Sequence, residues 1–561
     1  MRTIPTILAA SLVLASCAAP APDKQPADKP AAPPAAAPDA QPAAATLMPG
    51  MGNHHHPIAT RSPDAQRFFD QGIDLVFGFN HEEAVRSFKR ASELDATAAM
   101  PHWGIAWALG PNYNLDVDDE RGKQANQAIA RAIELSKNGP DSERAYVGAM
   151  AIRFPIGAKP DRAALARKYA DAMGDLSRRY PDDLDAATLY AESLMNLRAW
   201  KLWSLDGKPA ERTEEIVRVL ESVLARDPNH LGANHYYIHT LEASPSPARA
   251  LPSAVRLGTL APAAGHLTHM PAHIYARTGD QAAAARANEA GANADRAYFK
   301  TASADSFYAL AYFTHNLHFL ADSEMMRGRL AAARQAAAEV AAKLAPHTQM
   351  MPMVESLITM KTAVLLRFGR HDEILALPAP AANHPVEVAW WHFARGVALA
   401  RTGKADDAAA ARAALAAQTA KVPNEALFGG TGLETAKSIL ALAAAVLDAQ
   451  IAWARGARDE AIRHWTLAVA AADKVQYDEP PVFFYPVRES LGAALLLGGK
   501  AADAERVFRD DLVRHPRNAR SLFGLHASLE AQGRSADAEW VKRAFDEAWQ
   551  DADTMLTIEA L

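Results

Sequence analysis

Residues 65–98 read AQRFFDQGIDLVFGFNHEEAVRSFKRASELDATA and contain the pattern that decides the fold. Gly72 is followed by Ala84 after 12 residues and by Phe88 after 16, on the two expected helices of one hairpin. Small residues let paired helices cross closely, and a bulky residue fills the next turn. A turn glycine followed five residues later by alanine recurs along the chain. Its further occurrences are Gly279/Ala284, Gly328/Ala333, Gly403/Ala408, Gly456/Ala461, Gly499/Ala504 and Gly533/Ala538.

The pattern resembles tetratricopeptide repeats, which have a period of 34 residues. Gly492, Ala504 and Phe508 reproduce the same offsets near the other end of the chain. The resemblance implies an all-α fold, a right-handed superhelical solenoid of helix pairs. Good or fair units are expected at 65–98, 99–132, 231–264, 265–298, 314–347, 389–422, 442–475, 485–518 and 519–552. Degenerate pairs are expected over 140–225 and 350–378.

The composition supports a helical protein and excludes several classes of function. Alanine-rich stretches such as 331–342 favour helix over strand. The 59 basic and 65 acidic residues leave a net charge of −6, which argues against nucleic-acid binding. A single cysteine excludes an intrachain disulfide and any cysteine-based zinc or iron–sulfur site.

That cysteine has a position that suggests a role. Arg2, an apolar stretch over 4–15 and small residues before Cys17 resemble a bacterial lipoprotein signal over 1–16. The resemblance implies that Cys17 carries the lipid anchor, in the outer membrane, with the folded part in the periplasm. A plain secretory signal with a chance cysteine is the alternative.

The remaining chain divides into three expected parts. Residues 17–60 are rich in alanine and proline and are expected to form a disordered tether. An N-terminal repeat array over 61–347 and a C-terminal array over 348–561 follow it. The tether also holds His54, His55 and His56; such a short run could add metal ligands, but it is more typical of a solvated tract.

Histidines concentrate in one part of the repeat array. Eight of the chain's 20 histidines fall within residues 230–318. Seven of them are spaced three or four residues from another, so that they share a helix face. These seven are His235, His239, His266, His269, His273, His315 and His318.

The repeat register relates these histidines to one another. His235 and His269 are 34 residues apart, as are His239 and His273. Within the repeat, the seven occupy the second, fifth and ninth places of the first helix. In the repeat family these places resemble those that face the concave groove. The sequence therefore predicts a histidine patch contributed by three successive units.

Such a patch predicts a transition-metal site. Packed helices lie about 8–10 Å apart, so histidines on neighbouring helices can share one ion. Neutral imidazole suits zinc, copper, iron or nickel, and the pattern does not choose among them. Two alternatives stay open: a histidine-lined groove for an envelope protein or peptide without any metal, and a structural coincidence.

Two carboxylates extend the metal hypothesis. Asp322 lies four residues after His318, and Glu242 lies three after His239. Either could orient an imidazole, bind a metal or act as a base. A metal-dependent hydrolase or oxidoreductase is therefore a further alternative, and the sequence does not decide whether the chain is an enzyme.

Overall fold

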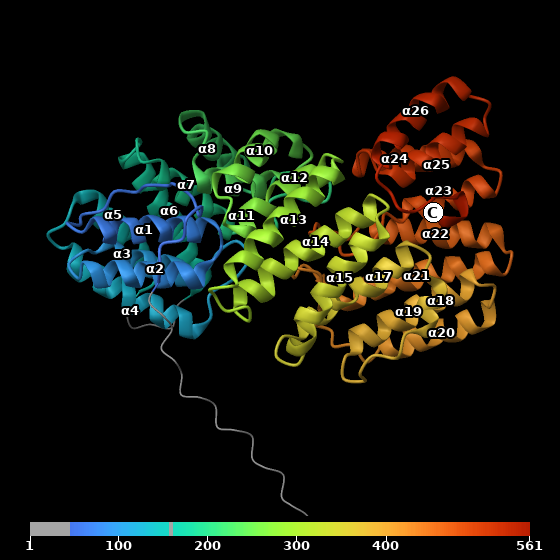
Figure 1. Ribbon diagram of the computed structural model, residues 1–561, viewed down its shortest axis with the longest axis horizontal. Coiled ribbons are helices and arrows are strands. Elements are labelled where there is room, and N and C mark those ends of the chain that lie inside the picture. Colours follow the sequence, from blue (N-terminus) through green and yellow to red (C-terminus); the bar gives the residue numbers. More distant parts are fainter. Residues whose placement is uncertain (1–44, 156–160) are drawn as a thin grey trace, which may run out of the picture. The chain divides into compact units, whose positions relative to one another are not determined.

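The computed structural model describes residues 45–155 and 161–561, and Figure 1 shows them as successive helices. The predicted signal, Cys17 and the predicted tether up to residue 44 lie outside the described residues. The described part is a helical-repeat array, so the predicted all-α, tetratricopeptide-like fold is confirmed.

Consecutive helices pair in the N-terminal half. The pairs are α1 (Pro63–Phe77) with α2 (His81–Leu94), α3 (Met100–Leu109) with α4 (Asp119–Ser136), α5 (Asp141–Arg153) with α6 (Arg162–Arg179), α7 (Leu184–Asn196) with α8 (Thr213–Arg226), α9 (Leu231–Leu241) with α10 (Leu251–Leu260), α11 (Gly265–His269) and α12 (Pro271–Arg277) with α13 (Gln281–Tyr298), and α14 (Thr314–Met326) with α15 (Leu330–Leu344). The degenerate segment 140–225 therefore contains two pairs.

The pairing continues to the end of the chain. The pairs are α16 (Glu355–Ile358) and α17 (Met360–Arg367) with α18 (His371–Ala376), α19 (Pro385–Arg401) with α20 (Ala405–Thr419), α21 (Ala436–Ala454) with α22 (Arg458–Ala472), α23 (Arg488–Leu497) with α24 (Ala501–Arg514), and α25 (Ala519–Glu530) with α26 (Ser535–Ala548). The degenerate segment 350–378 forms one pair.

Short elements interrupt the array at a few places. Strands β1 (Leu427–Phe428) and β2 (Glu434–Thr435) form an antiparallel ladder in the loop before α21. The 3₁₀ turns are η1 (Pro247–Ala250), η3 (Ala345–His347), η4 (Pro352–Val354) and η5 (Ile558–Ala560). A π-helical turn, η2 (Ala309–Phe313), leads directly into α14. Such π-helical turns are rare in proteins overall, and those that occur are often found at functional sites.

Local capping explains where the helices begin. The Ser62 hydroxyl accepts a hydrogen bond from the Ala65 amide at 3.2 Å, and Pro63 occupies the first turn of α1. Asp280 caps α13 in the same way. The preceding residue, Gly279, has a φ of 85°, a left-handed conformation that glycine adopts without steric cost.

The predicted small and bulky residues pack as the period requires. The Phe88 ring fills the space between Gly72 of its own pair and Gly104 of the next pair. A Cβ atom would lie 2.4 Å from the ring at Gly72 and 2.6 Å at Gly104. Phe508 lies in the same way between Gly492 and Gly524. Each bulky residue therefore joins two successive pairs, which is how the array propagates.

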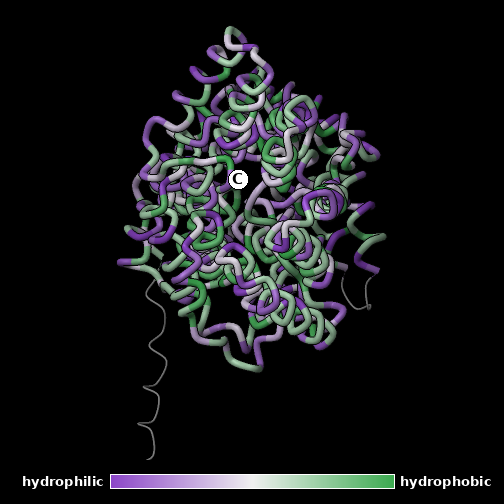
Figure 2. The backbone as a smooth tube through the Cα atoms, turned by 90° about the vertical axis from the view of Figure 1, so that its right-hand side faces the viewer, coloured by the Kyte–Doolittle hydropathy of each residue, from purple (hydrophilic) through white to green (hydrophobic). Residues whose placement is uncertain are grey.

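Two large hydrophobic cores support the array. One is built from buried residues between 45 and 312, and the other from buried residues between 321 and 561. Figure 2 shows green hydrophobic and purple hydrophilic stretches alternating along the backbone. Helix α21 is long and apolar enough to span a membrane by length and composition, but most of it is buried in the second core.

The end of the chain also contacts a helix pair that is far from it in sequence. The Arg327 guanidinium contacts the Asp551 carboxylate at 2.9 Å, and the Asp553 amide donates to the Gly328 carbonyl at 3.2 Å. These contacts fix the last helix pair against the turn that follows α14.

Residues 45–62 lie against the helices, although the sequence analysis assigned most of them to a tether. The Met48 amide donates to the Gln71 side chain at 2.6 Å, and Gln71 donates to the Thr46 carbonyl at 3.0 Å. Met51 is buried in the first core. These backbone groups bind specific side chains of α1, a pairing that composition does not reveal.

We expect Gly72→Ala to lower the free energy of unfolding by about 1–3 kcal/mol, because the new methyl group overlaps the buried Phe88 ring. Urea unfolding followed by circular dichroism measures the change. Gly148→Ala is the matched control, since a Cβ atom there meets nothing within 4 Å. Because alanine is the better helix former, the control should gain up to about 1 kcal/mol. Equal effects at the two positions would contradict the packing of Phe88.

Candidate metal centre

All seven predicted histidines lie on the first helices of three successive pairs. His235 and His239 are on α9, His266 and His269 on α11, and His273 on α12. His315 and His318 are on α14, directly after the π-helical turn η2. The repeat therefore brings these helices side by side, as the 34-residue spacing predicts.

Six of these side chains form two groups of possible metal ligands, together called the histidine cluster. The first group is His235, His239 and His266; the second is His269, His273 and His315. Within each group, one ligand atom from every residue lies within 4.8 Å of the others. The groups adjoin, because the His239 and His273 rings are 5.6 Å apart and the His266 and His269 rings 5.7 Å.

Four histidines of the cluster bind acceptors through Nδ1. His235 Nδ1 donates to the Phe77 carbonyl at 2.5 Å, and His269 Nδ1 donates to the Asn288 side-chain oxygen at 2.6 Å. The Glu242 carboxyl takes the other two, with its Oε1 3.0 Å from His239 Nδ1 and its Oε2 2.7 Å from His273 Nδ1. In a neutral imidazole the second nitrogen then carries no proton. Each Nε2 atom therefore presents a lone pair.

These lone pairs face one another inside the protein. Two of them, His269 Nε2 and His273 Nε2, lie 2.8 Å apart. His235 Nε2 lies 3.2 Å from the Nε2 atom of His266, which can donate to it because His266 Nδ1 binds no acceptor. His239 Nε2 is buried without a hydrogen-bond partner. Two bare nitrogens at 2.8 Å repel each other unless a cation or a proton lies between them. The arrangement is therefore suited to a cation.

Burial favours the neutral form of five of these imidazoles. His235 and His269 are fully buried, and His239 is 2 % exposed. Burial lowers the pKa of His235 to about 3 and of His315 to about 4. It lowers three more in the same direction, and neighbouring imidazoles add to the effect; these are His239, His266 and His269. Neutral imidazole is the form that binds metals.

Two carboxyl groups lie beside the cluster. Glu242, predicted from sequence, contacts both groups, and Glu479 reaches His273 from the loop between α22 and α23. Burial and the nearby Glu479 raise the pKa of Glu242. The pKa of Glu479 is lowered, because His273 outweighs the opposing effect of burial. Tyr477 donates a further hydrogen bond to Glu479.

Two other predicted residues do not join the cluster. His318 instead lines a small cavity with Trp390 and Pro480, and burial lowers its pKa to about 3. Asp322 is buried, which raises its pKa to about 7, but it belongs to none of the ligand groups among the described residues. Placement in the repeat register put both on the correct helix, but their distance from the other rings depends on packing.

The cluster does not line an open groove wall, as the sequence analysis expected. Phe79 covers it, with its ring 4.6 Å from that of His235, 5.2 Å from His266 and 5.8 Å from His239. On another side the rings of Tyr113 and Trp200 pack on His239, at 5.2 and 5.7 Å. The histidines therefore face the protein interior.

Two of these covering residues have unusual backbone conformations. Phe79 has a φ of 55° and Trp200 a φ of 60°, a backbone conformation that is disfavoured for residues other than glycine. Phe79 directly precedes the Asn80 cap, the place that Gly279 has before Asp280. The chain accepts this strain at the position where an aromatic ring covers the cluster. Strained residues of this kind are concentrated at functional sites.

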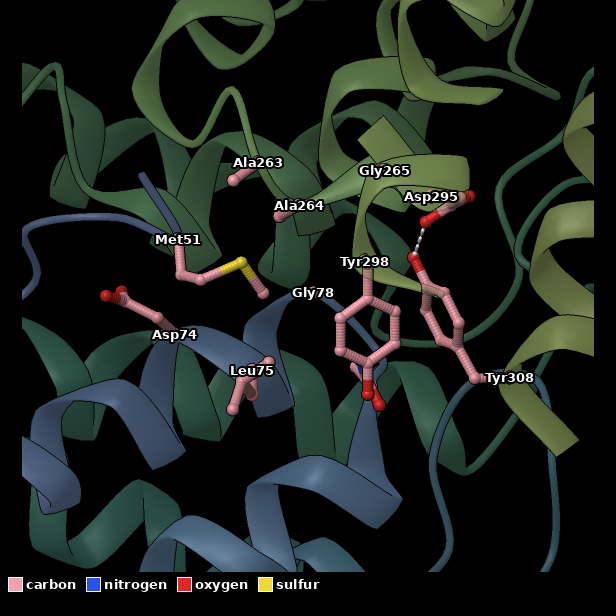
Figure 3. Close-up of a pocket in the computed structure, with 11 residues that line it drawn as sticks. Met51, Asp74, Leu75, Gly78, Ala263, Ala264, Gly265, Asp295, Tyr298 and Tyr308 are labelled. Carbon is pink, nitrogen blue, oxygen red and sulfur yellow. Dashed lines mark hydrogen bonds between the residues drawn. The ribbon is translucent and has the colours of Figure 1, made fainter. Parts of the chain in front are cut away.

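A hydrogen-bonded tyrosine fixes the start of α11 (Figure 3). The Tyr308 hydroxyl accepts from the His266 amide at 3.1 Å and donates to Asp295 Oδ1 at 2.8 Å. Burial raises the pKa of Asp295 to about 7. Met51 and Asp74 line the same small pocket from the other side. The backbone that carries His266 and His269 is thus fixed by side chains outside the cluster.

A second set of histidines lies around Asp185, on α7. His54 Nε2 and His56 Nδ1 contact its carboxylate at 2.9 and 2.7 Å, and His230 Nε2 at 3.2 Å. The expectation of a solvated run is therefore wrong for His54 and His56, which are 12 % and 13 % exposed, whereas His55 is 61 % exposed. The physical reason is the buried carboxylate, which requires donors. Its charge raises the pKa of His54 to about 9 against the effect of burial.

Sequence reasoning missed Glu479 as a neighbour of the cluster. It lies 206 residues after His273, in an aromatic, proline-rich loop that does not follow the repeat pattern. No spacing rule relates a loop residue to a helix so distant in the chain. The departure of the 479–489 segment from the repeat pattern was the only available signal.

The comparisons with known proteins concern the helical architecture alone. No family model and no curated protein matches the chain. The human IFIT1 dimer with m7Gppp-AAAA is 13% identical, with a TM-score of 0.33, over 88% of this chain and 91% of that chain. The APC/C hetero-tetramer Cut9-Hcn1 is 11% identical, with a TM-score of 0.28, over 89% and 95%. At these values the likeness carries no argument about function, and the helix pairing rests on this chain's own helices.

We expect the free energy of unfolding of Phe79→Gly to exceed that of Phe79→Ala by about 1 kcal/mol, because only glycine adopts a positive φ freely. Urea unfolding measures the difference. Both variants lose the same buried ring, so the comparison isolates the backbone. The same pair of substitutions at Ile105, buried within α3, should give the opposite order, since alanine is the better helix former. An alanine variant of Phe79 that is as stable as the glycine variant would show that the turn is not strained.

Proposed function

We propose that this chain binds a transition metal through the histidine cluster. The observation that carries the proposal is the pair of imidazole nitrogens of His269 and His273, which face each other at 2.8 Å with both Nδ1 atoms bound to acceptors. A metal ion between them would turn this repulsion into two bonds. Hydrogen bonds from the far nitrogen of a ligating histidine to a carboxylate or a carbonyl are typical of metal sites, since they fix the ring orientation.

The distances support an ion of ordinary size. Nitrogens bonded at about 2.0–2.1 Å lie about 3.3 Å apart around a tetrahedral ion and about 2.9 Å apart at a right angle. The pairs of facing nitrogens in the two groups are 3.2 and 2.8 Å apart. Imidazole ligands suit zinc, copper, iron and nickel.

Burial favours a resident ion over a transported one. With the rings enclosed by Phe79, Tyr113 and Trp200, an ion would exchange only when the covering residues move. The enclosure also separates the cluster from any peptide on the outer surface. The helical-repeat scaffold suggests that the outer surface binds a protein or another ligand, and we propose that this binding partner is an envelope protein. Lipidation at Cys17, in an outer membrane facing the periplasm, completes the proposal.

Metal analysis of the full-length chain, purified without a histidine tag, tests the proposed site. We expect the wild type to retain zinc or another first-row metal after dialysis, and the His235→Ala/His269→Ala variant to lose most of it. His392→Ala, which changes a partly exposed helix histidine outside the cluster, should retain the wild-type amount. Equal and negligible metal in all three proteins would reject the proposal.

We expect Glu242→Gln to weaken metal affinity by about 10- to 100-fold, the usual effect of altering a group that orients metal-ligating histidines. Glutamine keeps the shape of the side chain but replaces one acceptor oxygen with an NH₂ donor. The glutamine side chain therefore cannot accept hydrogen bonds from both His239 and His273 through separate oxygens. Competition with a chromophoric chelator measures the affinity. Glu221→Gln, on the outer surface of α8, is the control and should leave the affinity unchanged.

A further inference from the structure

The histidine cluster is divided into two halves of equal composition. Each half contains three imidazoles. Helix α9 supplies two to the first half and α11 supplies the third, whereas α11, α12 and α14 supply one each to the second half. In the first half, the rings of His235 lie 4.8 Å from His239 and 5.0 Å from His266. In the second half, the rings of His269 lie 4.8 Å from His273 and 4.9 Å from His315. The spacing around the central ring of each half is therefore the same.

The rings across the boundary are about as far apart as the outer rings of each half, which are His239 and His266 at 6.3 Å and His273 and His315 at 5.6 Å. The pairs that cross the boundary, His239 with His273 and His266 with His269, are 5.6 and 5.7 Å apart. A close nitrogen–nitrogen contact also occurs within each half, at 3.2 Å and at 2.8 Å. An ion at the first contact would leave the lone pairs of His269 and His273 facing each other, and an ion at the second would leave the buried Nε2 of His239 without a partner.

We infer that the cluster holds two neighbouring transition-metal ions, one for each group of three histidines. The inference rests on the proposed function and adds the number of ions and their arrangement. Three nitrogen ligands leave a four-coordinate ion with one open position, and adjoining ions can share a small bridging anion there.

The buried carboxylates agree with two ions. A dication in a dry interior requires nearby negative charge. Glu242 is 1 % exposed and Glu479 4 % exposed, and both contact His273. Glu242 also contacts His239, so one carboxylate connects a ligand of each group. Arg277 donates to the Glu242 backbone carbonyl at 2.8 Å, and the Glu242 carboxyl contacts His239, His273 and Glu479.

The two groups can be disabled separately. His266 and His315 each supply one ligand to a different group, and His266 Nδ1 has no hydrogen-bond partner. His266→Asn and His315→Asn therefore remove one ligand each and leave the four Nδ1 hydrogen bonds of the other rings in place. Far-UV circular dichroism and the urea midpoint show whether each variant keeps its fold, and His392→Asn is the matched control.

The experiment counts ions in the full-length chain loaded with Zn²⁺ and dialysed. We expect about two equivalents of zinc per chain in the wild type and in His392→Asn. We expect about one in His266→Asn and in His315→Asn, because the altered group should lose its affinity for zinc by tenfold or more. Loading with Cu²⁺ adds a second measurement. Two neighbouring Cu²⁺ ions couple magnetically and weaken the paramagnetic resonance signal per copper, whereas each single variant should give the full signal of an isolated ion.

The outcomes separate this inference from the proposed function. One equivalent in the wild type, lost entirely in both single variants, would show a single shared ion and overturn the inference while leaving the proposed function standing. Two equivalents with a full copper signal would overturn the neighbouring arrangement. No bound metal in the wild type would overturn both. Should an asparagine variant fail to fold, His266→Gln and His315→Gln provide the same comparison.

Discussion

The direction of four imidazole lone pairs is the constraint on which the rest of the site depends. His235, His239, His269 and His273 each use Nδ1 to bind an acceptor outside the ligand group, so their Nε2 atoms turn inward. A histidine that is free to rotate binds metals weakly because its orientation must first be fixed. Here the fold fixes it through a backbone carbonyl, an amide and a carboxyl group. The acceptors therefore matter as much to the chemistry as the ligands do.

The helical repeat is what makes this arrangement possible. Each pair exposes one face of its first helix to the next pair, and histidines at equivalent places come together without any special loop. The π-helical turn before α14 and the tyrosine that binds the His266 amide fix the helix ends in this region. Elsewhere in the array, glycine–phenylalanine contacts such as Gly72 with Phe88 join the pairs. A regular scaffold thus presents an irregular, densely polar interior.

That interior is costly to fold. Buried imidazoles with facing lone pairs, two buried carboxyl groups and two aromatic residues at positive φ all oppose stability. Large apolar cores on both sides offset these costs. The second set of histidines differs, because His54, His56 and His230 all contact a single carboxylate, that of Asp185. These contacts hold the segment before α1 against the array.

Sequence alone determined the repeat, and with it the helices that carry the histidines. Glycine, alanine and phenylalanine at fixed offsets encode contacts within 34 residues. This spacing is enough to place Gly72 against Phe88, and to place His235 and His269 on the first helices of successive pairs. Only the tertiary structure decided which groups enclose the cluster. Glu479 reaches His273 from a distant loop, Phe79 covers the rings from a turn where glycine is usual, and His318 and Asp322 are excluded although their register is correct. The reason is that a repeat period specifies a direction along each helix, whereas burial and ring-to-ring distance depend on segments that follow no period.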